Sequence, residues 1–152
     1  MFTWKFVQAL VGAGLLVASS TSFSQSAAPA TVGEMITICA PIIDEQYNKD
    51  MDRWGQCVAA AKAYLEAVIP TLKTEEEIQA TVALVVEELV KLYRPQDCLV
   101  AQTELPLAIN TAKSYTTDEV QLAAIDNIYL AISGCQQVTT AAIQEIESLD
   151  AV

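Results

Sequence analysis

Three copies of the pattern Thr-x-x-Glu, starting at Thr31, Thr74 and Thr116, constrain the fold more than any other feature of the sequence. In this pattern the threonine and glutamate side chains each bond a backbone N–H group in the first turn of a helix. Apolar residues with helical spacing follow each copy. No long segment alternates with a period of two, and the chain has only 5 glycines and 5 prolines. We therefore predict an all-α fold, a small bundle of five to six helices.

The first two helices are bounded by proline residues and a polar turn. The first helix is expected to follow Thr31 and to be kinked or interrupted at Pro41, because proline lacks an N–H donor and clashes with the preceding turn. The polar residues 44–52 are expected to contain a turn. The second helix is predicted over residues 52–69 and ends before Pro70.

The middle of the chain predicts a central helix followed by a broken one. The third helix should begin near Glu75 and stop before Pro95. Its broad apolar face is typical of a helix surrounded by others, and consists of Ile78, Val82, Val85, Val86, Leu89, Val90 and Tyr93. The fourth helix is predicted over residues 98–113, with a kink or a split at Pro106.

Two further helices are expected near the C-terminus. The fifth should be capped by Thr116 and Glu119, carry Val120, Ala124, Ile128 and Ile132, and end at Gly134 in the left-handed conformation. The last should start near residue 140 and bury Ile143, Ile146 and Leu149.

Two segments of the chain resemble each other at a spacing of about forty residues. RWGQC at residues 53–57 is echoed by RPQDC at 94–98, 41 positions later. TEEEIQ at residues 74–79 is echoed by TTDEVQ at 116–121, 42 positions later. Such a period is typical of a repeated helical hairpin. Two copies of a weak pattern also arise by chance, so a duplicated helical hairpin and a non-repeating bundle both stay open.

Residues 1–24 are interpreted as a signal peptide. Lys5 supplies a positive charge, and the apolar run 6–18 is shorter than the roughly 20 residues that span a bilayer. Ser22 and Ser24 place small side chains before a cleavage site that would leave Gln25 at the new N-terminus. An uncleaved anchor helix is the alternative. No stable membrane anchor is expected after cleavage.

The mature chain would then consist of a flexible leader, residues 25–30, and a single helical domain, residues 31–152. It carries 7 basic and 19 acidic residues, a net charge of −12. Nucleic acids and anionic membranes would repel such a chain, so neither is expected as a partner. A charged protein partner should present a basic surface. Alternatively, the charge only keeps the protein soluble.

Four cysteines remain after cleavage, and an exported chain with an even number is expected to form disulfides. In an antiparallel helix pair, residues at equal distances from the turn face each other. The midpoint of Cys39 and Cys57 lies in the predicted turn at residues 44–52, and that of Cys98 and Cys135 lies at 116–117. We therefore predict Cys39–Cys57 and Cys98–Cys135. Other pairings stay open, because all four could lie at one end of the bundle.

The sequence offers little material for catalysis or metal binding. It contains no histidine, which removes the common nucleophile–base pairs, and no Cys-x-x-Cys pair for zinc. Paired carboxylates such as Glu87 and Glu88 lie on expected polar surfaces. A calcium loop starting at Asn48 would have Arg53 where glycine is required. We predict a non-enzymatic protein without metal or cofactor.

Trp54 is the only tryptophan outside the signal segment and follows an acidic turn. It either covers the end of the core over Cys57 or anchors an interface beside Tyr47, Asp50 and Asp52. Tryptophan and tyrosine dominate binding hot spots, so these four residues are the candidate partner-binding site.

The stretch from Cys57 to Cys98 resembles the small periplasmic immunity proteins of type VI secretion, the Tai/Rap type. The likeness rests on a cysteine entering an alanine-rich helix and on the residues Tyr64, Leu65, Ala67, Val68, Thr74, Ile78, Val85, Val86 and Leu89. It implies a disulfide-bonded helical protein that neutralises a toxic effector in the periplasm. The cysteine that such proteins often carry ahead of the second helical unit is missing here, and no binding residue is carried over.

Two functions are compatible with these observations. The first is an exported, periplasmic or secreted protein that binds another protein, as an inhibitor, an immunity protein or an envelope adaptor. The second is a helical carrier whose interior, rich in small aliphatic residues, holds a small lipophilic ligand. The oligomeric state stays open.

Overall fold

The computed structural model describes residues 27–98 and 104–147, and within them the all-α prediction is confirmed. The expected signal peptide and cleavage site, and Leu149, lie outside these residues. The helices are α1 (Val32–Tyr47), α2 (Gln56–Val68), α3 (Glu75–Val90), α5 (Leu105–Thr111), α6 (Glu119–Ser133) and α7 (Thr140–Glu147). Short 3₁₀ turns, η1 (Ile69–Thr71), η2 (Pro95–Asp97) and η3 (Ala112–Tyr115), join some of them.

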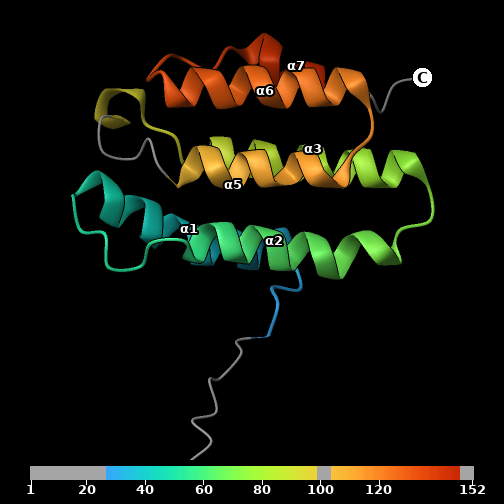
Figure 1. Ribbon diagram of the computed structural model, residues 1–152, viewed down its shortest axis with the longest axis horizontal. Coiled ribbons are helices and arrows are strands. Elements are labelled where there is room, and N and C mark those ends of the chain that lie inside the picture. Colours follow the sequence, from blue (N-terminus) through green and yellow to red (C-terminus); the bar gives the residue numbers. More distant parts are fainter. Residues whose placement is uncertain (1–26, 99–103, 148–152) are drawn as a thin grey trace, which may run out of the picture.

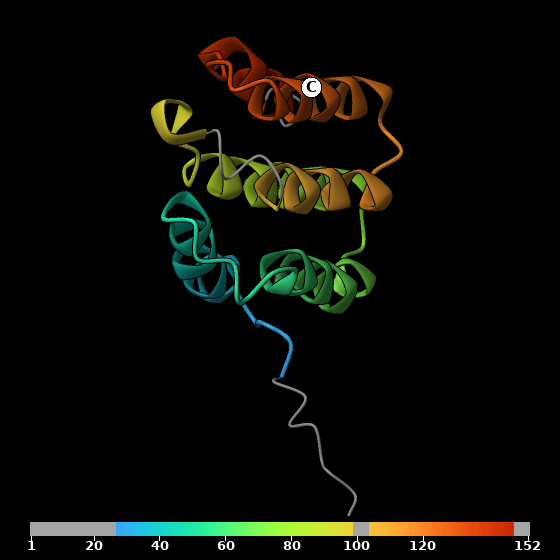
Figure 2. The same ribbon diagram turned by 60° about the vertical axis from the view of Figure 1, so that its left-hand side comes forward.

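The helices form three layers of two: α1 beside α2, α3 beside α5, and α6 beside α7 (Figures 1 and 2). All three layers contribute buried side chains to one core. Val82, Val85, Val86 and Leu89 of α3 are fully buried, so the predicted central helix is confirmed. In the described part of the chain, no helix has the length and hydropathy needed to cross a membrane.

Two of the three predicted caps form as expected. Thr31 Oγ1 accepts the Glu34 N–H at 3.1 Å, while Glu34 reaches back to the N–H of Ala30 at 2.7 Å. Thr74 and Glu77 make the complete reciprocal pair, with both bonds at 3.2 Å. Within the predicted leader, Pro29 is buried.

Two prolines lie within helices. Helix α1 continues through Pro41 without the interruption that was one predicted outcome, and Ile42 and Ile43 next to it are buried. Residues 99–103 of the predicted helix over 98–113 lie outside the described residues, and Pro106 lies in the first turn of α5. A proline is tolerated there because the N–H groups of a first turn have no partner within the helix.

The ends of α6 are displaced from their expected positions. Asp118, two residues after Thr116, caps the helix by accepting the Gln121 N–H at 2.7 Å. Val120 in the first turn is 53% exposed, whereas Ala124, Ile128 and Ile132 are buried. At the other end Gly134 has φ −90°, and the left-handed residue is Cys135 with φ 54°.

Both predicted disulfides are present. Cys39 and Cys57 join α1 to the start of α2 with their Cα atoms 4.5 Å apart. Cys98 and Cys135 join the residue after η2 to the end of α6, with Cα atoms 5.5 Å apart. Each disulfide therefore ties together segments that the helical packing already brings to one place.

Corresponding positions of the suspected repeat touch each other. Thr117 Oγ1 donates to the carboxylate of Glu75 at 3.0 Å, and Gln121 Nε2 donates to the carbonyl of Gln79 at 2.8 Å. Both pairs are 42 residues apart, so α3 and α6 run parallel and start at the same end of the bundle. The duplication itself stays a hypothesis.

Candidate functional site

The loop between α1 and α2, residues 48–55, contains most of the predicted partner-binding residues and is called the α1–α2 loop below. It lies at the left-hand end of the bundle in Figure 1. Asp50 and Asp52 are exposed at its tip, together with Trp54, which is 48% exposed. Met51, which the sequence analysis did not select, is 52% exposed. The loop therefore exposes two large apolar side chains and two carboxylates.

The loop leaves α1 through a tight, fully bonded turn. The N–H of Lys49 bonds the carbonyl of Gln46 at 3.1 Å, and that of Asp50 bonds the carbonyl of Glu45 at 2.8 Å. This is the Schellman arrangement, with Lys49 in the left-handed position at φ 67°. The last carbonyls of α1 thereby find partners, and the direction of the loop is fixed.

An ion pair closes the same side of the loop. The guanidinium of Arg53 makes a two-pronged contact with the carboxylate of Glu45, with Nε donating to Oε2 at 3.0 Å. This hydrogen bond lowers the pKa of Glu45 and raises the pKa of Arg53. The contact spans the loop from α1 to the residue next to Trp54.

The other side of the loop is held by Glu104, a carboxylate with no exposed surface. It accepts the backbone N–H groups of Gly55 at 3.0 Å, Cys57 at 2.6 Å and Val58 at 3.1 Å. It also accepts the side-chain amide of Gln46 at 2.6 Å. The first N–H groups of a helix lack partners within the helix and carry partial positive charge, so a carboxylate is favoured there.

Glu104 explains why α2 begins at Gln56 and not near residue 52. Gly55 has φ 82°, a left-handed conformation outside the helical range, and supplies no side-chain cap. The cap comes instead from a residue 46 to 49 positions away in the chain. No local sequence signal could have identified it.

Tyr47 belongs to the base of the loop and not to its exposed surface. Its side chain is buried, and its hydroxyl accepts the Arg94 N–H at 2.8 Å and donates to the Leu92 carbonyl at 3.4 Å. The Arg94 guanidinium lies over the ring, 4.1 Å from its centre, and bonds Asp44 at 2.8 Å. Burial raises the pKa of Tyr47. Asp50, Asp52 and Trp54 are thus exposed on the same loop, whereas Tyr47 is buried against Leu92 and Arg94.

In the described part of the chain, no group of three or more Asp, Glu, Cys or His residues could hold a metal ion. Comparison with protein-family models, curated proteins and solved structures finds no match to this chain.

Proposed function

We propose that this protein is exported and binds another protein, one with a basic surface, through the α1–α2 loop. The observation that carries the proposal is the exposure of Trp54 and Met51 beside Asp50 and Asp52. Tryptophan and methionine are enriched in interface cores, and carboxylates at the rim guide a basic partner toward them. The protein acts by occupying its partner and not by catalysis.

The way in which the loop is held supports this use. The Arg53–Glu45 ion pair fixes one side, and Glu104 with the Cys39–Cys57 disulfide fixes the other. A loop ordered before binding loses little conformational entropy in the complex. These contacts give the molecule a preformed apolar anchor.

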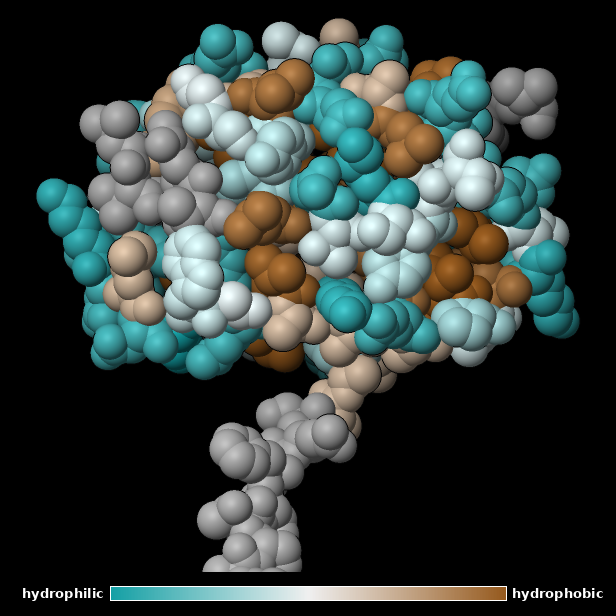
Figure 3. All heavy atoms as spheres, viewed as in Figure 1, coloured by the Kyte–Doolittle hydropathy of each residue, from teal (hydrophilic) through white to brown (hydrophobic). Residues whose placement is uncertain are grey.

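One face of the molecule shows how its hydrophobic residues are distributed. On the face formed by α2, α5 and α6, hydrophobic residues lie in separate groups divided by hydrophilic ones (Figure 3). The negative charge of the chain would speed the approach of a basic protein, and this steering weakens as salt is added.

An oxidising compartment is proposed on the basis of the two disulfides and the apolar N-terminal segment. A periplasmic or secreted protein should begin at or near Gln25 when it is recovered from its native envelope and sequenced from the N-terminus. An intact Met1 in a soluble cytoplasmic fraction would contradict export.

The resemblance to Tai/Rap-type immunity proteins supports one form of this proposal, an inhibitor that neutralises a toxic effector in the periplasm. An envelope adaptor is the other form. A toxin gene adjacent to the gene for this protein would favour the inhibitor, because toxins and their immunity proteins are encoded together.

The binding proposal is tested by photo-cross-linking in the native envelope. A benzophenone amino acid replaces Met51, which leaves Trp54 intact, and a second variant carries it at Ala67, exposed at the other end of α2. We expect an adduct from position 51 alone. Excess unlabelled protein should compete for it, and Trp54→Ala protein should not. Absence of a competable adduct at position 51, or the same adduct from position 67, would contradict the proposal.

A carrier of a small lipophilic ligand is the second candidate, favoured by one observation. A groove of about 520 Å³ lies along α1 and α2, and its lining is almost entirely apolar: Ala27, Ala28, Pro29, Ile38, Ala59, Ala60 and Ala63, with Gln56 as the polar exception. Native mass spectrometry of protein purified without detergent discriminates the two functions. Retained ligand mass supports a carrier, and a clean protein mass counts against it.

A further inference from the structure

The two disulfides of the protein differ in exposure. Cys39 and Cys57 have no exposed surface and belong to the hydrophobic core. Cys98 is 1% exposed, whereas its partner Cys135 is half-buried. A thiol must reach a sulfur atom in order to exchange with a disulfide, and exposed disulfides are the ones that are reduced most readily. The Cys98–Cys135 disulfide is therefore the one that a reductant in solution can approach.

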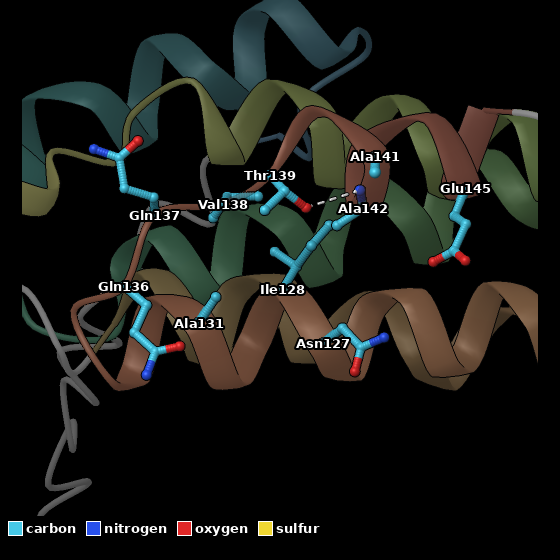
Figure 4. Close-up of a pocket in the computed structure, with 10 residues that line it drawn as sticks. All are labelled: Asn127, Ile128, Ala131, Gln136, Gln137, Val138, Thr139, Ala141, Ala142 and Glu145. Atoms are coloured by element: carbon cyan, nitrogen blue, oxygen red, sulfur yellow. Dashed lines mark hydrogen bonds between the residues drawn. The ribbon is translucent and has the colours of Figure 1, made fainter.

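The turn that contains Cys135 ends α6 at the surface. The Gln136 N–H bonds the Ala131 carbonyl at 2.8 Å, as in a Schellman turn, and Cys135 takes the left-handed position with φ 54°. Gly134 and Gln136 on either side of it are exposed, and in Figure 4 the side-chain amides of Gln136 and Gln137 point away from the space between α6 and α7. A residue other than glycine is strained in this conformation, so the turn can relax once the disulfide is opened.

The residues just before Cys98 hold the end of α1. The Arg94 N–H donates to the Tyr47 hydroxyl at 2.8 Å, and the Arg94 guanidinium lies over the Tyr47 ring and bonds Asp44 at 2.8 Å. The turn η2 connects Arg94 to Cys98 and is closed by the Asp97 N–H, which bonds the Arg94 carbonyl at 3.0 Å. The disulfide thus anchors to α6 a short turn whose other end contacts the base of the α1–α2 loop.

We propose that the Cys98–Cys135 disulfide is a redox switch for binding at the α1–α2 loop, opened by a protein dithiol. A thiolate of the dithiol attacks the Sγ atom of Cys135, the S–S bond breaks, and the Cys98 sulfur leaves as a thiolate and takes up a proton. The second thiol of the dithiol then attacks the mixed disulfide and releases Cys135. Two electrons and two protons pass to this protein, and the dithiol becomes a disulfide.

Reduction removes the covalent restraint on η2 and so loosens the end of α1. The ion pair of Arg94 with Asp44 is exposed, and such pairs alone contribute little to stability. A loop that is less ordered loses more conformational entropy in a complex, so the oxidised protein binds its partner more tightly. The hydrogen bond from the Tyr93 hydroxyl to the Gln136 carbonyl, at 2.9 Å, keeps the two thiols near each other for reoxidation. The inference rests on the proposed function.

The first experiment identifies the disulfide that opens. Purified, oxidised protein is incubated under native conditions with dithiothreitol as the probe dithiol, and samples are quenched and alkylated with iodoacetamide over time. Peptide mapping should find Cys98 and Cys135 alkylated at least tenfold faster than Cys39 and Cys57. Equal rates, or faster opening of Cys39–Cys57, would overturn the proposal.

The second experiment measures whether the loop responds, by hydrogen exchange in ¹H–¹⁵N NMR spectra before and after the selective reduction. The Asp50 N–H, which bonds the Glu45 carbonyl at 2.8 Å, should exchange at least fivefold faster in the reduced protein. The Leu72 N–H, in the turn at the other end of α2, is the control and should change less than twofold. Unchanged exchange at Asp50, or equal changes at both groups, would contradict the switch.

The third experiment tests binding with a permanently open variant, because a reductant added to the envelope would also act on other proteins. Protein with Cys98→Ser and Cys135→Ser, which keeps the Cys39–Cys57 disulfide, carries the benzophenone amino acid at position 51. Its yield of the partner adduct should be at least fivefold lower than that of the oxidised protein, with helix content by circular dichroism retained. The exchange measurement on the wild type does not depend on the folding of this variant.

The outcome is separable from that of the proposed function. If the oxidised protein and the open variant give the same competable adduct, this inference fails and the proposed function stands. If the oxidised protein gives no competable adduct, the assignment of the switch to partner binding fails together with the proposed function.

Discussion

At the scale of a single residue, the role of Glu104 in the fold could not be predicted from the sequence. Its neighbours in the chain give no indication of burial, yet it receives four hydrogen bonds and has no exposed surface. A buried carboxylate is costly unless its oxygens are bonded, and here the start of α2 provides the donors. The exposed members of the site, Asp50, Asp52 and Trp54, were predictable from the sequence, whereas Glu104, which holds the loop, was not.

Replacing Glu104 with alanine should therefore destabilise the protein by about 3–5 kcal/mol, because several buried N–H groups lose their acceptor at once. Urea unfolding of the oxidised protein measures the loss. The control is Glu66→Ala, at an exposed residue whose pairing with Lys62 at 3.6 Å should contribute less than about 1 kcal/mol. Equal losses in the two variants would show that Glu104 does not cap α2.

At the scale of elements, the sequence predicted features with a local cause and failed where distant contacts decide. The Thr74–Glu77 cap, the central position of α3 and both disulfide pairs were predictable from spacing alone. The start of α6 was misplaced because Asp118, a strong capping residue, competes with Thr116. Its end was misplaced because the disulfide partner Cys135, and not Gly134, takes the left-handed position.

The Cys98–Cys135 disulfide is expected to be a main source of stability for the α6 end of the bundle. Replacing both cysteines with serine should lower the free energy of unfolding by about 2–5 kcal/mol, as for other small disulfide-bonded domains. Guanidinium unfolding of wild type and the double variant measures the change. Non-reducing peptide mapping of the wild type provides the matching check. It should recover the Cys39–Cys57 and Cys98–Cys135 peptides, and a Cys57–Cys98 link would refute the pairing.

The molecule as a whole contains two disulfides and carries a strong negative charge. The disulfide pairs were predictable from the spacing of the cysteines, and the charge follows from composition. The three-layer order of the helices was not predictable, because hydrophobic periodicity shows which face of a helix is buried and not which helix it meets. Four tyrosines make the stability of the whole fold sensitive to pH. Tyr47, Tyr64, Tyr93 and Tyr115 come from different parts of the chain, and burial raises the pKa of each above 10.0.

The stability of the fold should consequently decrease in alkali. A raised pKa means that the folded protein holds the phenolic protons more tightly than the unfolded chain does. The corresponding stabilisation is complete below pH 10.0 and is lost as the pH rises through the higher pKa values of the folded state. Urea midpoints should stay level from about pH 8 to 10 and fall between about pH 10 and 11.5, and Tyr47→Phe should flatten this fall. A midpoint independent of pH in this interval would contradict the burial of these hydroxyls.

The central claim is that the α1–α2 loop is the anchor for a basic protein. Its most direct test is to purify the cross-linked partner and to measure its affinity for single variants of this protein. Trp54→Ala should weaken binding by about 30-fold or more, which corresponds to about 2 kcal/mol for a hot-spot tryptophan. Val120→Ala truncates an apolar side chain of similar exposure, 53% against 48%, at the start of α6 and should change the affinity less than threefold. An unchanged affinity for Trp54→Ala, or equal losses in both variants, would contradict the claim.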